Sequence, residues 1–303
     1  MRRLALGSAV LTIFFWSSAF VGIRVGLTVF SAWHLVLLRF LTASAVLLVG
    51  VLVTRGRVIP PRRVWGRVAA SGVAGFTVYH TALTLGERTV AASTASFIIA
   101  GAPLFSAVIA RLFLGERLTG QAWGGMGLSL AGVAVLSGMG PSVHWNALLI
   151  VLSAVSTAAY FILEKPLLAE FRALDVTAWV TWAGTIPMLS YLHGFVAAVL
   201  TAPAYPLLMV LYIGVFPAAV AYVTWSIALR ESTVAQVTPM LYLNPVLASL
   251  LGWVMLGERP GWDLVIGGVM ILTGVWVVQS RGRPKRLPRV EEDGSSDRRR
   301  ENL

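Results

Sequence analysis

The chain has 303 residues, of which 57% are hydrophobic and only 12% are charged. A soluble protein of this length could not bury so much apolar surface, so the composition indicates an integral membrane protein with lipid as its main solvent. The net charge of +11 comes from short loops and from the tail after Ser280. Attraction to anionic lipid head groups explains this charge, and no nucleic-acid partner is expected.

Ten apolar windows of about 20 residues, each bounded by charges or by Pro and Gly clusters, predict an all-α fold of ten transmembrane helices. The first window is long enough to span and is followed by equally apolar segments, so we interpret it as an uncleaved span rather than a signal peptide. In chain order the windows cover 5–25, 34–53, 65–86, 90–114, 120–138, 145–163, 177–200, 206–229, 232–256 and 261–279.

A set of short motifs occurs twice in the same order. Thr89-Val90-Ala91, Pro103 and Leu114-Gly115-Glu116-Arg117 recur as Thr233-Val234-Ala235, Pro245 and Leu256-Gly257-Glu258-Arg259. The prediction is therefore two five-helix repeats, residues 1–140 and 141–280, followed by a disordered basic tail, 281–303. Five crossings reverse the chain direction, so the second repeat is expected to be inverted, as in many secondary transporters that work by alternating access.

The basic residues predict the orientation in the membrane. With both termini in the cytoplasm, Arg88 and Arg259 are the only basic residues in outside loops, and Arg24 and Arg39 lie within spans. All other Lys and Arg residues then lie in inside loops or in the tails, as the positive-inside rule requires. We therefore expect a multi-pass protein of the bacterial inner membrane with both termini cytoplasmic.

Pro103 and Pro245 fall near the middle of the fourth and ninth spans, at matching positions of the two repeats. Each proline frees a helical carbonyl, which is costly in lipid unless it faces protein or a wet cavity. The pair therefore suggests bent helices that line a central site, although a simple packing kink is an alternative. Pro217 of span eight matches Gly75 of span three, so locally weak helix and possible hinges are predicted there too.

Aromatic and polar residues fall on the helices that the two repeats are expected to place at the centre. A cavity lined by such residues suits small, partly apolar solutes. The candidate cavity residues are Trp16, Phe20, Tyr79, His80, Phe97, Pro103, Tyr160, Tyr222, Trp225, Tyr242, Asn244 and Pro245. Aromatic side chains also form belts at the membrane interface, which is the alternative for this group. His80 is the one deeply placed titratable candidate other than arginine, and a packed neutral histidine is its alternative.

The few charged residues in or near the spans gather at two levels and could form gates that close alternately. The outer candidates are Arg24, Arg39 and Glu87, and the inner candidates are Glu164, Lys165, Arg230 and Glu231. Snorkelling to the head groups is the alternative for all of them. No carboxylate is expected deep within a span, which leaves the coupling to protons open.

Several of these motifs resemble the EamA-type members of the drug/metabolite transporter superfamily. The resemblance rests on Trp16-Ser-Ser-Ala-Phe20-Val21 with Arg24, on Leu38-Arg39-Phe40, and on the doubled Leu-Gly-Glu-Arg motif that follows Pro103 and Pro245. It covers about 5–280 and implies an inverted five-plus-five arrangement, a central cavity and export of amino acids or similar metabolites. It also implies a fold-stabilising role for Glu116 and Glu258.

The leading hypothesis is thus a secondary transporter that exports a small-molecule substrate and contacts membrane lipid. A membrane-embedded enzyme and a passive channel are the alternatives, but the sequence has no zinc motif and no phosphate-binding loop. The absence of cysteine excludes disulfides and thiolate metal sites, and no cofactor is expected. Glycines of spans five and ten permit close helix approach, within one chain or between two, so both a monomer and a homodimer stay open.

Overall fold

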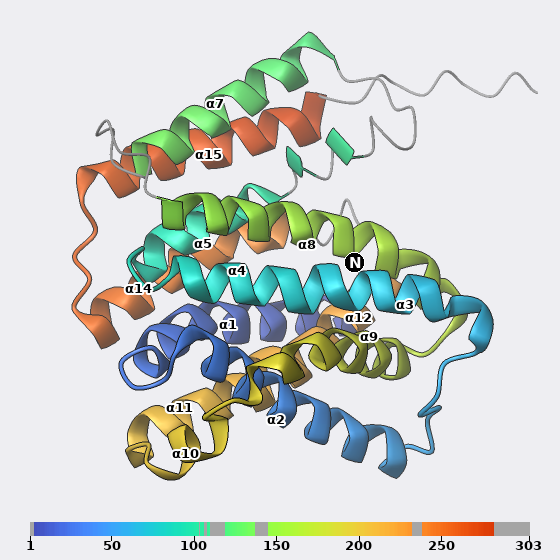
Figure 1. Ribbon diagram of the computed structural model, residues 1–303. Coiled ribbons are helices and arrows are strands. Elements are labelled where there is room, and N and C mark those ends of the chain that lie inside the picture. Colours follow the sequence, from blue (N-terminus) through green and yellow to red (C-terminus); the bar gives the residue numbers. More distant parts are fainter. Residues whose placement is uncertain are drawn as a thin grey trace, which may run out of the picture.

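The computed structural model describes residues 3–102, 104–105, 108–109, 119–136, 145–231 and 238–281, which form helices and their connections with no strand among them (Figure 1). The first half holds α1 (Arg3–Gly26), α2 (Ala32–Val53), the 3-10 helix η1 (Arg62–Val64), α3 (Trp65–Gly72), the π-helix η2 (Val73–Val78), α4 (Tyr79–Gly86), α5 (Ala92–Ala100) and α7 (Gly120–Leu136). The second half begins with α8 (Trp145–Glu170), α9 (Ala173–Met188), the 3-10 helix η3 (Leu189–Leu192), α10 (Phe195–Leu200) and α11 (Ala204–Val215). It ends with the π-helix η4 (Phe216–Val220), α12 (Ala221–Glu231), the 3-10 helix η5 (Thr238–Tyr242), α14 (Leu243–Leu256) and α15 (Trp262–Arg281).

Within the described ranges, five helical stretches are long and apolar enough to cross a membrane. They are Arg3–Gly26, Ala32–Val53, Arg62–Gly86, Trp145–Glu170 and Ala204–Glu231, and three shorter apolar helices accompany them, Trp123–Val135, Met240–Leu256 and Trp262–Val277. Large apolar side chains such as Leu200 and Trp262 are exposed, whereas Arg39, Glu87 and Glu164 are buried. An apolar exterior around a partly polar interior is the distribution expected of a multi-pass membrane protein.

Helices of one half pack mainly against helices of the other. Helix α1 contacts α11, α12 and α14, while α8, which holds the same place in the second half, contacts α3, α4 and α5. The pairs α2–α9, α5–α14 and α7–α15 join segments with equivalent sequence positions. Figure 1 shows α7 and α15 side by side at one edge of the helical bundle. The interior is therefore built by both halves together.

Two predicted span boundaries are wrong. The span expected at 145–163 continues as α8 to Glu170, because the apolar side chains of Leu167 and Leu168 are buried against the protein. The span expected at 177–200 is divided into α9, η3 and α10. Pro187 lacks the N–H needed to continue α9, and Gly194, with a φ of 71°, reverses the chain before α10.

The irregular helix predicted at Gly75 and Pro217 is present. A π-helical turn, η2, contains Gly75, and a second, η4, contains Pro217. Such turns are uncommon inside α-helices and occur often at functional sites. A Cβ atom on Gly75 would lie 2.5 Å from Cγ of Tyr160, so glycine lets the Tyr160 ring of α8 lie directly against this turn.

Candidate functional site

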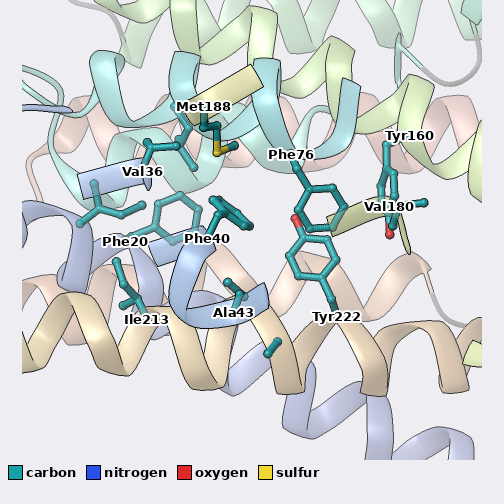
Figure 2. Packing of buried hydrophobic residues seen from close by; sticks show 14 of the residues in the cluster. Phe20, Val36, Phe40, Ala43, Phe76, Tyr160, Val180, Met188, Ile213 and Tyr222 are labelled. Carbon is teal, nitrogen blue, oxygen red and sulfur yellow. The ribbon is translucent and has the colours of Figure 1, made fainter. Parts of the chain in front are cut away.

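The two π-helical turns bring a cluster of aromatic rings together in the centre of the molecule. Figure 2 shows Phe40 of α2, Phe76 of η2, Tyr160 of α8 and Tyr222 of α12 in this cluster. The ring centroid of Phe76 lies 5.5 Å from that of Phe40, 5.6 Å from that of Tyr160 and 4.8 Å from that of Tyr222. These are ordinary distances for attractive aromatic pairs. Segments of both halves therefore meet ring against ring at this level.

His80 belongs to the same cluster. Its Nε2 atom is 3.0 Å from the hydroxyl oxygen of Tyr222, and its ring lies 4.5 Å from Phe40 and 4.3 Å from Tyr79 by centroid. His80 and Tyr222 thus join α4 of the first half to α12 of the second. This is the packed histidine, hydrogen-bonded to a neighbouring helix, that the sequence offered as the alternative.

Three consecutive residues of α1 make polar contacts with the second half. Trp16 Nε1 donates to the carbonyl of Pro217 over 3.2 Å, and Ser17 Oγ donates to Oδ1 of Asn244 over 3.0 Å. The hydroxyl of Ser18 lies 2.8 Å from that of Tyr212. The Trp16 acceptor is a carbonyl within π-helix η4, where the regular α-helical bonding pattern is interrupted.

Trp16 also extends the aromatic cluster toward the C-terminal end of α12. Its ring centroid is 5.2 Å from that of Tyr222 and 5.3 Å from that of Trp225. Phe161 of α8 lies 5.6 Å from Trp225. The structure therefore brings together six of the predicted cavity residues, namely Trp16, Tyr79, His80, Tyr160, Tyr222 and Trp225.

Of the other predicted cavity residues, Asn244 accepts the hydrogen bond of Ser17 described above. Phe20 and Pro245 are buried, and Tyr242 is half-buried. Phe97 packs against α15, because a Cβ atom on Gly268 would lie 2.5 Å from its ring. Pro103 lies outside the described residues.

Pro245 does not interrupt a regular α-helix, because the helix type changes just before it. Pro245 is the third residue of α14, which follows the 3-10 helix η5. The N–H groups of the first helical turn have no partner within an α-helix, so a proline there sacrifices no α-helical hydrogen bond.

At the C-terminal end of α1, two of the three residues predicted for the outer gate lie together. Arg24 Nη1 donates to the backbone carbonyl of Glu87 over 2.7 Å, and Arg24 Nε is 3.9 Å from Oε1 of Glu258. Glu258 also accepts from the backbone N–H of Ala92, at 3.1 Å, and from Ser93 Oγ, at 3.3 Å. Glu258 was not among the predicted gate residues, and its contacts tie α1, the start of α5 and the turn after α14 to one another.

The Glu258 carboxylate stabilises the start of α5, where free N–H groups and the helix dipole favour a negative charge. We expect Glu258→Ala to lower the free energy of unfolding by about 1–2 kcal/mol, which is the usual value of such a cap. The midpoint of thermal unfolding in detergent would show this loss. Glu170→Ala is the control, since that carboxylate pairs at the surface with Arg63, and equal losses in the two variants would contradict the capping role.

The comparisons with known proteins agree with this architecture. The model of the EamA-like transporter family matches the chain twice, over residues 3–138 and 144–280. The chain belongs to the EamA-like transporter family. It is accordingly a transporter rather than an enzyme.

Several curated relatives of this EamA-like chain carry transporter names. The probable terminal-alkyne amino-acid exporter of Streptantibioticus cattleyicolor is 35% identical over 284 residues, which are 91% of this chain and 94% of the relative. The uncharacterized transporter YdfC of Bacillus subtilis is 34% identical, over 86% of each chain. A solved crystal structure shares the fold with a TM-score of 0.63 and 22% identity, over 92% of this chain and 97% of that one.

The inner gate candidates of the EamA-like chain differ in burial. Lys165 and Arg230 are exposed, which fits the alternative that they reach toward head groups. Glu231 is half-buried, and Glu164 has no exposed surface. Its Oε1 atom accepts from Ser226 Oγ over 3.0 Å.

Glu164 lies further inside its helix than the predicted span, which ended at residue 163. Because α8 runs on to Glu170, Glu164 is about 9 Å from the end of the helix at 1.5 Å per residue. Ser226 in turn lies 3.1 Å from the hydroxyl of Thr177, so a short polar chain joins α8, α12 and α9. In the described part of the chain, no group of three His, Asp or Glu side chains could hold a metal ion.

Proposed function

We propose that this EamA-like protein exports amino acids or similar small, partly apolar metabolites by alternating access. The observation that carries the proposal is the central aromatic cluster, which η2 and α4 of the first half build together with α12 of the second. A site shared by two halves can open to either side when the halves move relative to each other. The substrate class is supported by the relative named as a probable amino-acid exporter.

The architecture we propose is ten spans in two inverted five-helix repeats, residues 1–140 and 141–280. The family model matches once in each half. The exchange of partners between α1 and α8 also supports this, since each packs against the third- and fourth-span segments of the opposite half. We further place the protein in the inner membrane with both termini in the cytoplasm, which the name of the Escherichia coli inner membrane transporter YedA, 27% identical, supports in part.

The contacts of the central cluster indicate what must move during transport. A substrate at this level has to separate Phe76 and His80 of the first half from Tyr222 of the second. The two π-helical turns lie beside these rings, and we propose that they act as the hinges. Opening toward the outside would also break the contacts of Arg24 with Glu87 and Glu258.

Counterflow in proteoliposomes tests the proposed function. Each vesicle preparation is loaded with one unlabelled amino acid. It is then diluted into a solution that contains a trace of the same amino acid in labelled form. We expect transient, saturable accumulation of label for at least one apolar amino acid, with and without a pH gradient. Linear, unsaturable flux would instead indicate a channel, and no accumulation of any of the twenty amino acids would overturn the substrate class.

The inverted topology predicts opposite labelling at equivalent positions. The chain contains no cysteine, so each single-cysteine variant reports one site without background. Arg88 and Arg230 are both exposed and hold nearly equivalent positions in the two halves. In intact cells, we expect a membrane-impermeant maleimide to label Arg88→Cys and to spare Arg230→Cys. In inside-out vesicles the pattern should reverse, and labelling of both variants from one side would exclude inverted repeats.

A further inference from the structure

Two buried charges beside the central cluster have no hydrogen-bond partner among the described residues. Arg39 of α2 is only 2% exposed, and its Nε and Nη1 atoms are unpartnered there. Glu87, directly after α4, has no exposed surface, and both of its carboxylate oxygens are unpartnered in the same part of the chain. Burying a charge without a partner is costly, so two such groups of opposite sign require an explanation.

The two groups lie near each other without forming a pair. Helices α2 and α4 pack together here, since the ring of Phe40, next to Arg39, lies 4.5 Å by centroid from that of His80, and Glu87 follows His80 by two helical turns. No ion pair joins Arg39 to Glu87 in the described ranges. Arg24 donates its hydrogen bond to the backbone carbonyl of Glu87 and not to the carboxylate. A positive and a negative group thus lie on packed helices, with Nε and Nη1 of Arg39 and both carboxylate oxygens of Glu87 available to bind a ligand.

The neighbourhood adds an apolar wall and further polar atoms. Phe40, adjacent to Arg39, packs on His80 and on Phe76 of the central cluster. Nδ1 of His80 and Oγ1 of Thr84 are also buried and unpartnered among the residues described. Charged groups at one end and aromatic rings at the other match a ligand with a charged head and an apolar side chain.

We infer that Arg39 and Glu87 together recognise the two charges of a zwitterionic amino acid, which deepens the proposed function and rests on it. The Arg39 guanidinium binds the α-carboxylate, for which its planar fork of donors is suited. The Glu87 carboxylate binds the α-ammonium group. The ligand side chain lies toward Phe40 and Phe76.

The charges of the site distinguish a zwitterionic ligand from related ligands that carry only one charge. A zwitterion neutralises both buried groups at once and adds no net charge to the interior. A simple amine would leave Arg39 unpaired, and a simple carboxylic acid would leave Glu87 unpaired, each at the cost of an uncompensated buried charge. Selection against both analogues therefore follows from the same two residues.

Competition counterflow tests this assignment with the apolar amino acid that gives saturable counterflow in the wild type. The competitors are the unlabelled amino acid, its methyl ester, which lacks the carboxylate, and its deaminated acid, which lacks the ammonium group. In the wild type we expect each analogue to inhibit at least about tenfold more weakly than the amino acid, since a site built for a polar group rejects ligands without it. Arg39→Gln should lose the discrimination against the ester, and Glu87→Gln should lose the discrimination against the deaminated acid.

The controls separate recognition from folding and from gating. Arg88→Gln alters an exposed neighbour of Glu87 and should keep the wild-type selectivity. Arg39→Lys is the substitute if Arg39→Gln does not fold, because lysine keeps the positive charge and lacks the planar guanidinium donors. This variant should still weaken inhibition by the amino acid more than inhibition by the ester. Unchanged selectivity in the Arg39 and Glu87 variants, including a fall in rate alone as expected of gate residues, would overturn the inference. Absence of flux in the wild type would instead overturn the proposed function.

Discussion

Replacing Gly72 by valine is expected to destabilise the native fold strongly. At this position α3 and α9 meet backbone to backbone, and a Cβ atom on Gly72 would lie 2.6 Å from the carbonyl oxygen of Val180 and 2.7 Å from the nitrogen of Gly184. Backbone atoms cannot swing aside as a flexible side chain can, so the two helices would have to separate. Overpacking of this kind costs about 1–3 kcal/mol or more, a large part of a typical folding free energy.

Gly66→Val provides the matched control for Gly72→Val. Gly66 lies on the same helix α3, and a Cβ atom there would meet nothing within 4 Å. The yield of monodisperse protein and the midpoint of thermal unfolding should therefore fall sharply for Gly72→Val and stay near the wild-type values for Gly66→Val. Equal behaviour of the two variants would show that α3 and α9 do not approach this closely.

The sequence predicted the helical class of the fold and much of the centre because both depend on local signals. A membrane span needs a long apolar run, and such runs are visible in hydropathy alone. The irregular turns at Gly75 and Pro217 were found because both residues weaken a helix locally and match in the two halves. Comparing the halves also pointed to the central aromatic residues, of which Trp16, Tyr160 and Tyr222 do meet.

The features that the sequence missed depend on contacts between distant segments. Hydropathy ended the sixth span before Glu164, yet its side chain is buried inside α8 and accepts a hydrogen bond from Ser226, sixty-two residues further along. Phe97 was assigned to the cavity from its position on span four, but its ring fills the space over Gly268. The resemblance gave Glu258 a structural role, and only the fold shows that the role is a bond to the start of α5 and to Arg24.

The glycines of the predicted fifth and tenth spans show the same limit. Composition could not say whether they serve packing within the chain or contact between chains. A Cβ atom on Gly132 would lie 2.6 Å from the carbonyl oxygen of Gly267, and one on Gly125 would lie 2.7 Å from that of Gly274. These four glycines therefore allow α7 and α15 to pack closely within one chain. Gly124 and Gly127, by contrast, would meet nothing within 4 Å.

Trp16→Ala is expected to reduce counterflow about tenfold, because it removes one hydrogen bond and two aromatic contacts that together contribute about 1–2 kcal/mol. The indole joins α1 to the carbonyl of Pro217 and packs on Tyr222 and Trp225. Without it, the first and second halves lose a specific connection beside π-helix η4. Counterflow rates in proteoliposomes, normalised to folded protein, measure the effect.

Two further variants assign the loss to the position of Trp16 rather than to the removal of any tryptophan. Trp16→Phe keeps an aromatic ring and loses only the donor to Pro217, so its rate should fall between those of the wild type and Trp16→Ala. Trp145→Ala removes an indole that is 72% exposed at the start of α8, and it should leave the rate near that of the wild type. If Trp145→Ala and Trp16→Ala lowered the rate equally, the connection between α1 and η4 would have no part in transport, and the hinge proposed at Pro217 would lose its main support.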